Sequence, residues 1–360
     1  MKIEFPSHIK LVQAPVHSDK WHEHRLNYIG GSEVGTVLGI NKWSSSVKLW
    51  YEKSLQGEAA KFDNEPMFWG RIMEPKIAEM WQYYNPETSD YINNYNAGNK
   101  VRQLYDIDGF LVNENYPWLS VALDRIIPKG EKTLLGQELT AHAPLEIKTI
   151  DHYAHQASNT GLPPYYEAQI MMQMIVTESH YGEFAYMVGG MKYMVEPREF
   201  HQGFADSIIE TTHDFWYNHV LPARDIVQEI KESPAAEKRL RAKLNELEPA
   251  PDDSNMYAVF IKEQYQAEKE VMKAPDDLLW AIIEYDKAKK YINSLEKLST
   301  YAKNHLIKCH KDNQVEIIDF GEAGKSSLGK QHRITTKDSD IFITESEAKE
   351  NIDSIFYGGN

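Results

Sequence analysis

Apolar residues recur along this chain with two spacings, and each spacing predicts a different kind of element. Over Pro66–Tyr84 they fall near a 3.6-residue period, which predicts a long helix with one buried face. Shorter apolar runs over Val101–Val112, Trp118–Ile127 and Pro144–Ile150 predict three strands. The pattern therefore favours a helix packed on a sheet, as in an α/β domain.

Proline, serine and apolar positions predict further helices and strands. The Pro163-Pro164 pair predicts the start of a helix that runs to Thr177, because proline suits the first turn. Tyr181–Gly189 predicts another strand, and Val195–Val220 predicts a strand end followed by a helix. Ser32 predicts a helix N-cap, and residues 1–24 are expected to form an irregular lead-in.

The pattern changes after residue 223, where charged residues alternate with Leu, Ile and Ala. A helix is expected to end near Lys273, before a longer one over Asp276–Cys309. Its apolar residues repeat near 3.5 residues, which predicts an antiparallel helical hairpin or a short coiled coil. We therefore expect a core over 1–223 and a helical region over 224–313. A small β-hairpin near Gly321–Gly324 and a polar tail are expected within 314–360.

Composition narrows the class of protein. The chain has 360 residues, 42% apolar residues and a formal net charge of −15, so any nucleic-acid surface must be local. Its single cysteine, Cys309, excludes an internal disulfide, a Cys-ligated zinc site and an iron–sulfur cluster. No signal peptide and no apolar run of about 18 residues is visible, so we expect a cytoplasmic protein without a membrane segment.

Three polar residues in predicted strands carry the candidate chemistry. Glu146 and Lys148 lie two residues apart in one strand, so they share a face, and Asp124 lies in the preceding strand. Two carboxylates close together repel each other unless a cation lies between them. A divalent cation with a lysine beside it suits metal-assisted hydrolysis of a phosphodiester. The alternative interpretation is that Glu146 and Lys148 form the polar face of an amphipathic strand.

Five sequence blocks in this order resemble a known family of nucleases. Those blocks are Ile29-Gly30-Gly31-Ser32-Glu33, Trp69-Gly70-Arg71-Ile72-Met73-Glu74-Pro75, Ser120-Val121-Ala122-Leu123-Asp124, Leu145-Glu146-Ile147-Lys148-Thr149, and the Pro164–Met174 segment with Gln169. Together they resemble the phage-type exonucleases of the lambda-exonuclease/YqaJ group, within the PD-(D/E)XK superfamily. The resemblance covers about residues 21–220. It implies a restriction-endonuclease-like core, a central mixed sheet flanked by helices, with the helical region appended.

The resemblance also implies roles for individual residues. Asp124, Glu146 and the backbone carbonyl of Ile147 would bind Mg²⁺, with Mn²⁺ as a substitute, because hard cations prefer oxygen ligands. Glu74 would contribute to the same site directly, through water or through a second metal ion. Lys148 would position the attacking water.

Substrate-binding residues are implied in the same way. The family places an arginine seven residues before a serine in a pocket for a terminal 5′-phosphate, and Arg25 and Ser32 have that spacing. Gln169, on the helix after these strands, would hydrogen-bond a DNA phosphate or the scissile group, and Gln173, one turn further on, is a weaker candidate. The alternative is that Ser32 only caps its helix and that Arg25 is an ordinary surface residue.

Taken together, the resemblance implies a Mg²⁺-dependent exonuclease that degrades one strand of linear double-stranded DNA from the 5′ end. It would act in phage-type homologous recombination, encoded by a phage or prophage in a bacterial host cell. A single-strand annealing protein and a ring-shaped homo-oligomer are the implied partners. A structure-specific or internally cutting endonuclease, and a non-catalytic module that binds DNA ends, remain the alternatives.

Overall fold

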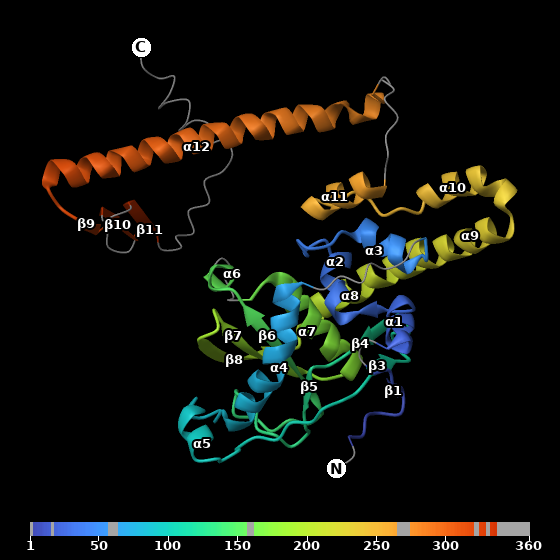
Figure 1. Ribbon diagram of the computed structural model, residues 1–360, viewed down its shortest axis with the longest axis horizontal. Helices are drawn as coiled ribbons and strands as arrows, with labels where there is room; N and C mark the ends of the chain where they lie inside the picture. The colour runs from blue at the N-terminus through green and yellow to red at the C-terminus, as the bar shows by residue number, and fades with distance from the viewer. Residues whose placement is uncertain are drawn as a thin grey trace. The chain divides into compact units, whose positions relative to one another are not determined.

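The computed structural model describes residues 3–15, 18–56, 64–156, 162–264, 274–319, 324–328 and 332–336 (Figure 1). The chain divides into two compact units, Met1–Gln266 and Ala267–Asn360. The sequence-based boundary after residue 223 falls inside the first unit, because Val227 and Leu244 belong to the same hydrophobic core as the strands.

The first unit contains two four-stranded sheets, and both are mixed. One sheet has the order β1-β3-β4-β2, in which only the β4–β2 pair is parallel. Its strands are β1 (Ile9–Val12), β3 (Phe110–Asn113), β4 (Leu119–Val121) and β2 (Ile29–Gly30). The other sheet has the order β5-β6-β7-β8, in which only the β6–β7 pair is parallel. Its strands are β5 (Arg125–Ile127), β6 (Ala143–Ile150), β7 (Tyr181–Val188) and β8 (Lys192–Glu199).

Two long helices pack on the second sheet and define two cores (Figure 1). Helix α4 (Glu65–Tyr83) begins at Asn64, whose side chain accepts a hydrogen bond from the Met67 N–H, and packs on β6 and β7. Helix α7 (Pro164–Thr177) starts at a proline and packs on β6 as well as on the first sheet. Leu145 and Ile147 contribute to the core on the α4 side, whereas Ile150 contributes to the core on the α7 side.

Shorter helices complete the described part of the first unit. These are α1 (Asp19–Leu26), η1 (Gly31–Glu33), α2 (Val34–Val37), α3 (Ser46–Lys53), α5 (Ile92–Asn96), α6 (His152–Gln156), α8 (Gln202–Asp214), the π-helical η2 (Phe215–Val220), α9 (Leu221–Glu232), η3 (Pro234–Ala236), α10 (Glu237–Asn245) and α11 (Asn255–Gln264). None of the helices in the described residues is both long enough and apolar enough to cross a bilayer.

The predicted α/β class is confirmed, and the differences are local. The expected strand over Trp118–Ile127 is two strands in different sheets, because the chain leaves β4 at Ala122 and enters β5 at Arg125. The expected single central sheet is accordingly two sheets. Of the run Val101–Val112, only its end forms a strand, β3. The expected irregular lead-in contains β1 and most of α1, because Ser18 caps α1 through the Trp21 N–H.

The second unit contains one long helix and a small sheet. Helix α12 (Leu279–Asn313) follows the short η4 (Asp276–Leu278), in the place where the sequence predicts a long helix. The described strands of this unit are β9 (Ile317–Asp319), β10 (Gly324–Leu328) and β11 (His332–Thr336). They form an antiparallel sheet of order β11-β10-β9. The expected hairpin is thus part of a three-stranded sheet. The predicted end of a helix near Lys273 lies outside the described residues.

A buried ion pair ties α4 to the second sheet. Arg102 donates to both carboxylate oxygens of Glu183, at 2.9 and 2.8 Å, and both side chains are almost completely buried. Trp81 of α4 and Tyr181 of β7 each donate a further hydrogen bond of 2.7 Å to the same carboxylate. Glu183 therefore holds three segments of the fold together.

Replacing Glu183 with glutamine should lower the free energy of unfolding by about 3–5 kcal/mol, because the Arg102 guanidinium would stay buried without a counter-charge. Denaturant titration of the full chain measures this change. The matched control is Glu79→Gln, which breaks the exposed Lys76–Glu79 pair and should leave stability nearly unchanged. Equal stability of the two variants would contradict the assigned role of Glu183.

Candidate active site

The site lies where β5 stops pairing with β6. The β5–β6 register ends at the Arg125–Leu145 pair, so the edge of β6 beyond Leu145 is open on that side. Asp124, the residue before β5, lies beside this open edge of β6, where its Oδ2 accepts a hydrogen bond of 2.7 Å from the Ile147 N–H. The break between β4 and β5 thus delivers an aspartate to the strand that carries Glu146 and Lys148.

Glu146 and Lys148 project from β6 toward α7. The Lys148 ammonium lies 2.5 Å from Glu146 Oε1 and 4.7 Å from the ring centroid of Tyr166. Glu146 is only 1% exposed, whereas the Lys148 side chain is 19% exposed. A buried carboxylate beside a partly accessible ammonium can present positive charge to a ligand that approaches from solvent.

The electrostatics of the three residues are coupled. Burial raises the pKa of Asp124 well above its ordinary value, and repulsion from Glu146 and Glu74 raises it further, against the opposing effect of Lys148. Burial lowers the pKa of Lys148, but the carboxylates of Glu146 and Asp124 outweigh burial and raise the pKa above its ordinary value. Lys148 is therefore a permanent ammonium group at neutral pH.

Glu74 approaches from the opposite face of the sheet, because it belongs to α4. Its Oε1 accepts a hydrogen bond of 2.8 Å from Arg125, and Arg125 Nε contacts Asp106 at 2.7 Å. Glu74 is close enough to influence the pKa of Asp124, but its direct partner is Arg125. Arg125 was not among the site residues predicted from the sequence, although it directly follows Asp124.

The donor set suits a hard divalent cation. Asp124 and Glu146 are neighbouring carboxylates whose mutual repulsion a cation would relieve, and Ile147, between Glu146 and Lys148 in β6, adds a backbone carbonyl as the third predicted ligand. Among the described residues, no three His, Cys, Asp or Glu side chains lie close enough together to hold a metal ion. A metal site here therefore needs oxygen ligands from the backbone or from the substrate as well.

Two glutamines of α7 hold the buried carboxylate. Gln169 Nε2 donates to Glu146 Oε1 and Gln173 Nε2 donates to Glu146 Oε2, each at 2.6 Å. The structure thus places Gln169, expected to contact DNA, on Glu146. Gln173 was the weaker candidate, yet it makes an equivalent contact. Their four-residue spacing puts both side chains on one helix face, and this spacing is the sequence signal for the pair.

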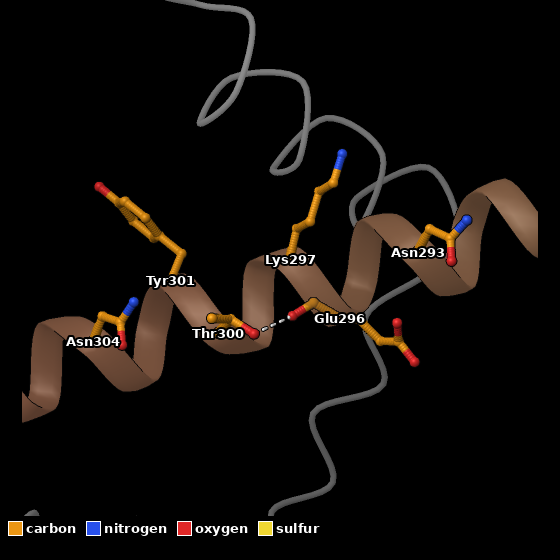
Figure 2. A pocket seen from close by; sticks show the side chains of 6 residues that line it. All are labelled: Asn293, Glu296, Lys297, Thr300, Tyr301 and Asn304. Carbon is orange, nitrogen blue, oxygen red and sulfur yellow. Dashed lines mark hydrogen bonds between the residues drawn. The ribbon is translucent and has the colours of Figure 1, made fainter.

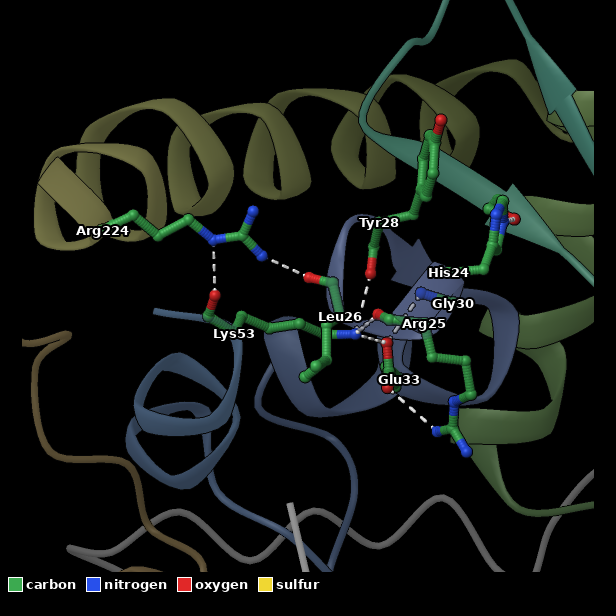
Figure 3. A network of polar contacts seen from close by, with 9 residues as sticks. His24, Arg25, Leu26, Tyr28, Gly30, Glu33, Lys53 and Arg224 are labelled. Carbon is green, nitrogen blue, oxygen red and sulfur yellow. Dashed lines mark hydrogen bonds and ion pairs between the residues drawn. The ribbon is translucent and has the colours of Figure 1, made fainter. Parts of the chain in front are cut away.

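Arg25 belongs to a second polar network, which Figure 3 shows. Its guanidinium contacts Glu33 Oε1 at 3.0 Å and lies 4.8 Å from the Trp21 ring, while 38% of the side chain is exposed. The buried Lys53 ammonium contacts Glu33 Oε2 at 2.7 Å. Burial raises the pKa of Glu33, but Lys53 and Arg25 outweigh burial and lower it to about 2, so Glu33 stays ionised at neutral pH.

Ser32 is exposed, and it is not the helix N-cap that the sequence predicted. Gly30 occupies the N-cap position of η1, and the Glu33 carboxylate accepts a hydrogen bond of 2.8 Å from its N–H. A Cβ at Gly31 would lie 3.7 Å from Gln169 and 4.0 Å from Gln173. The segment that carries Ser32 therefore packs against the two glutamines that hold Glu146.

The fold and the site define a class: α/β proteins in which an aspartate, a glutamate and a lysine meet at the open edge of a mixed sheet. Residues 20–180 match the model of the YqaJ-like viral recombinase domain. The matched segment contains Arg25, Glu74, Asp124, Glu146 and Gln169.

Individual relatives are more distant. The chain is 27% identical over 233 residues to the uncharacterized protein YqaJ of Bacillus subtilis (strain 168), a match that spans 64% of each chain and so less than two thirds of the relative. Among solved structures it is similar to an alkaline exonuclease, LHK-Exo, from Laribacter hongkongensis, with 19% identity, 63% of this chain and 100% of that chain covered, and a TM-score of 0.41. A phage-related exonuclease from Haemophilus somnus 129PT is 10% identical, covers 56% and 96%, and has a TM-score of 0.35.

Proposed function

We propose that this protein is a Mg²⁺-dependent deoxyribonuclease that removes nucleotides from one strand of linear double-stranded DNA, starting at the 5′ end. The observation that carries the proposal is the meeting of Asp124, Glu146 and Lys148 at the open edge of β6. The match of residues 20–180 to the model of a viral recombinase domain supports a role in phage-type homologous recombination. A single-strand annealing protein is the partner that such a role needs.

Each residue has a defined task in this proposal. Asp124, Glu146 and the Ile147 carbonyl would hold Mg²⁺ or Mn²⁺. When bound, such an ion supplies Lewis-acid chemistry that polarises a phosphodiester and makes water nucleophilic at neutral pH. Lys148, held as an ammonium, orients the attacking water and stabilises negative charge on the phosphate, because a group that keeps its proton at neutral pH is a poor base.

Supporting residues keep these groups in place. Gln169 and Gln173 fix both oxygens of Glu146, so this carboxylate has one orientation. Arg125 holds Glu74 beside the site, where Glu74 can bind a water or a second ion. Arg25 is proposed to bind the terminal 5′-phosphate with Ser32, because only one of its nitrogens contacts Glu33 and a guanidinium can bind a phosphate with two.

One digestion experiment tests the proposal. Linear duplexes labelled at either end, with and without a 5′-phosphate, are incubated with the protein in Mg²⁺, in Mn²⁺ and in EDTA, beside a closed circular duplex. We expect release of 5′-terminal nucleotides in either metal, none in EDTA, and no cutting of the circle. Cutting of the circle would favour the endonuclease alternative. Binding without any release would favour the non-catalytic module.

Replacing Arg25 with methionine should lower kcat/KM on 5′-phosphorylated ends by about 10- to 100-fold, because a charged hydrogen bond contributes about 1.5–3 kcal/mol. Activity on ends without the phosphate should change little. Lys42→Met, which removes an exposed cation near Trp43, is the matched control and should leave both substrates unaffected. An equal loss on both kinds of end would remove Arg25 from the phosphate pocket.

A further inference from the structure

Helix α12 presents an apolar stripe that the described residues of the chain do not cover. Leu278, the last residue of η4, and Tyr285, Ile292 and Leu295 of α12 are each about half exposed, between 48% and 60%. They recur at intervals of seven, seven and three residues, so they lie along one side of the helix. Exposed apolar residues in such a row mark an interaction surface rather than a solvated face.

The stripe continues as a full heptad pattern over the length of α12. The first core position of each heptad holds Leu278, Tyr285, Ile292, Ser299 and Leu306. The second core position holds Ala281, Ala288, Leu295, Ala302 and Cys309. Large residues thus dominate the first set and small residues dominate the second, which disfavours a parallel pair because Tyr285 would face its own copy.

An antiparallel pair combines the two sets, since each first-position residue then faces a second-position residue of the other helix. When Ile292 lies opposite Leu295, each of the remaining layers pairs either a larger residue with a smaller one or two small residues with each other. The layers are Leu278 with Cys309, Ala281 with Leu306, Tyr285 with Ala302, and Ala288 with Ser299. This arrangement fills the space between the helices evenly.

Charge pairs between the two helices favour the same antiparallel register. With Ile292 opposite Leu295, Lys289 lies beside Glu296 of the second copy, and the symmetry repeats this pair on the other side. Sliding the helices by one heptad in one direction places Lys289 beside itself. Sliding them in the other direction places Lys289 beside Lys303 and Glu296 beside itself. The attractive register is therefore the one with the best-matched layers.

The opposite side of α12 is mostly polar over the middle of the helix, whereas near its N-terminal end that side carries the exposed apolar residues Leu279, Trp280 and Ile283. Figure 2 shows six residues of this middle part, namely Asn293, Glu296, Lys297, Thr300, Tyr301 and Asn304. These residues line only a shallow hollow of the surface, without an ionic or apolar cluster that would recognise a ligand. Over this middle part of α12, the stripe is therefore the more apolar of the two sides.

We propose that α12 forms a two-fold symmetric, antiparallel coiled coil with α12 of a second copy of this chain. The contact is independent of the nuclease site and joins two copies, in addition to any ring that the catalytic units form.

Cysteine cross-linking of the full chain tests the register. In the proposed pair, Leu278 faces Cys309 of the second copy, so Leu278→Cys should give a covalent dimer under mild oxidation, detected on a non-reducing gel. The two residues cannot join within one chain, because Leu278 directly precedes α12 and Cys309 lies 31 residues further on, about 46 Å along the helix. Removing the native thiol, as Leu278→Cys with Cys309→Ala, should abolish the dimer. Efficient cross-linking of the unmodified chain through Cys309 would instead indicate parallel helices and overturn the proposal.

Sedimentation equilibrium tests the contact itself. Ile292→Glu with Leu295→Glu places charge in the central layers and should halve the mass of the assembly relative to the unmodified chain. The control, Asn293→Glu with Thr300→Glu, adds the same charge to the polar side and should keep the larger mass. If the unmodified chain and the central-layer variant have the same mass, other residues of the same chain cover the stripe and the proposal is wrong.

Discussion

Replacing Lys148 with alanine should reduce the rate of nucleotide release by about 10²–10³-fold, the loss typical of removing one pre-positioned charge from a transition state. The ammonium lies 2.5 Å from Glu146 and stays protonated because Glu146 and Asp124 raise its pKa. No other ammonium group contacts Glu146 within the residues that the structure describes. Single-turnover digestion of an end-labelled duplex in saturating Mg²⁺ measures the effect on chemistry apart from product release.

A second lysine of the same sheet provides the matched control. Lys192 begins β8 and is exposed, so Lys192→Ala should leave the rate unchanged. DNA-end binding by Lys148→Ala, measured in Ca²⁺ or EDTA, should remain close to that of the unmodified protein. A Lys148→Ala variant that releases nucleotides at the normal rate would remove this residue from the mechanism.

The elements that carry the site could be predicted from the sequence because each has a strong local signal. Proline at the start of α7 and the near 3.6-residue period of α4 mark helices whatever surrounds them. The β6 and β7 segments are dense in apolar residues because both faces of each strand are covered by helices. Local signals therefore located the strand with Glu146 and Lys148 correctly.

Features that depend on long-range pairing could not be predicted. The run Trp118–Ile127 reads as one strand, since nothing local to Ala122 shows that the chain leaves one sheet for another. That change of sheet is what sets Asp124 at the edge of β6. In the same way, the pairing of Glu74 with Arg125 joins residues 51 positions apart, and no local pattern encodes it.

The two glutamines of α7 illustrate an intermediate case. Their spacing of four residues predicts a shared helix face, and the helix was correctly placed. Whether that face meets DNA or a carboxylate depends on the distance between α7 and β6, which the sequence leaves open. The structure places both amides on Glu146, so Gln169 and Gln173 act on the site through this carboxylate.

Replacing Asp124 with asparagine should abolish nucleotide release and, without metal, stabilise the fold. Burial and repulsion from Glu146 and Glu74 raise the pKa of Asp124, so its charged form is disfavoured in the folded protein. Asparagine keeps an oxygen that can accept the Ile147 N–H and removes the charge. Since a raised pKa means that the charged form costs free energy in the folded state, we expect the free energy of unfolding in EDTA to rise at neutral pH.

The contribution of Asp124 to the free energy of unfolding should depend on pH in one direction only. A raised pKa means that protonated Asp124 favours the folded state fully below the ordinary aspartate pKa, and this contribution is lost as the pH rises through the folded-state pKa. In EDTA, the stability advantage of Asp124→Asn should therefore grow with pH and vanish in acid.

Mg²⁺ should reverse the order of stability of the two proteins, because a bound ion stabilises only the protein that retains the carboxylate. Melting temperatures in EDTA and in Mg²⁺ measure both effects, with Asp206→Asn on the exposed side of α8 as the control. Equal stabilisation of the unmodified protein and Asp124→Asn by Mg²⁺ would show that Asp124 is not a metal ligand.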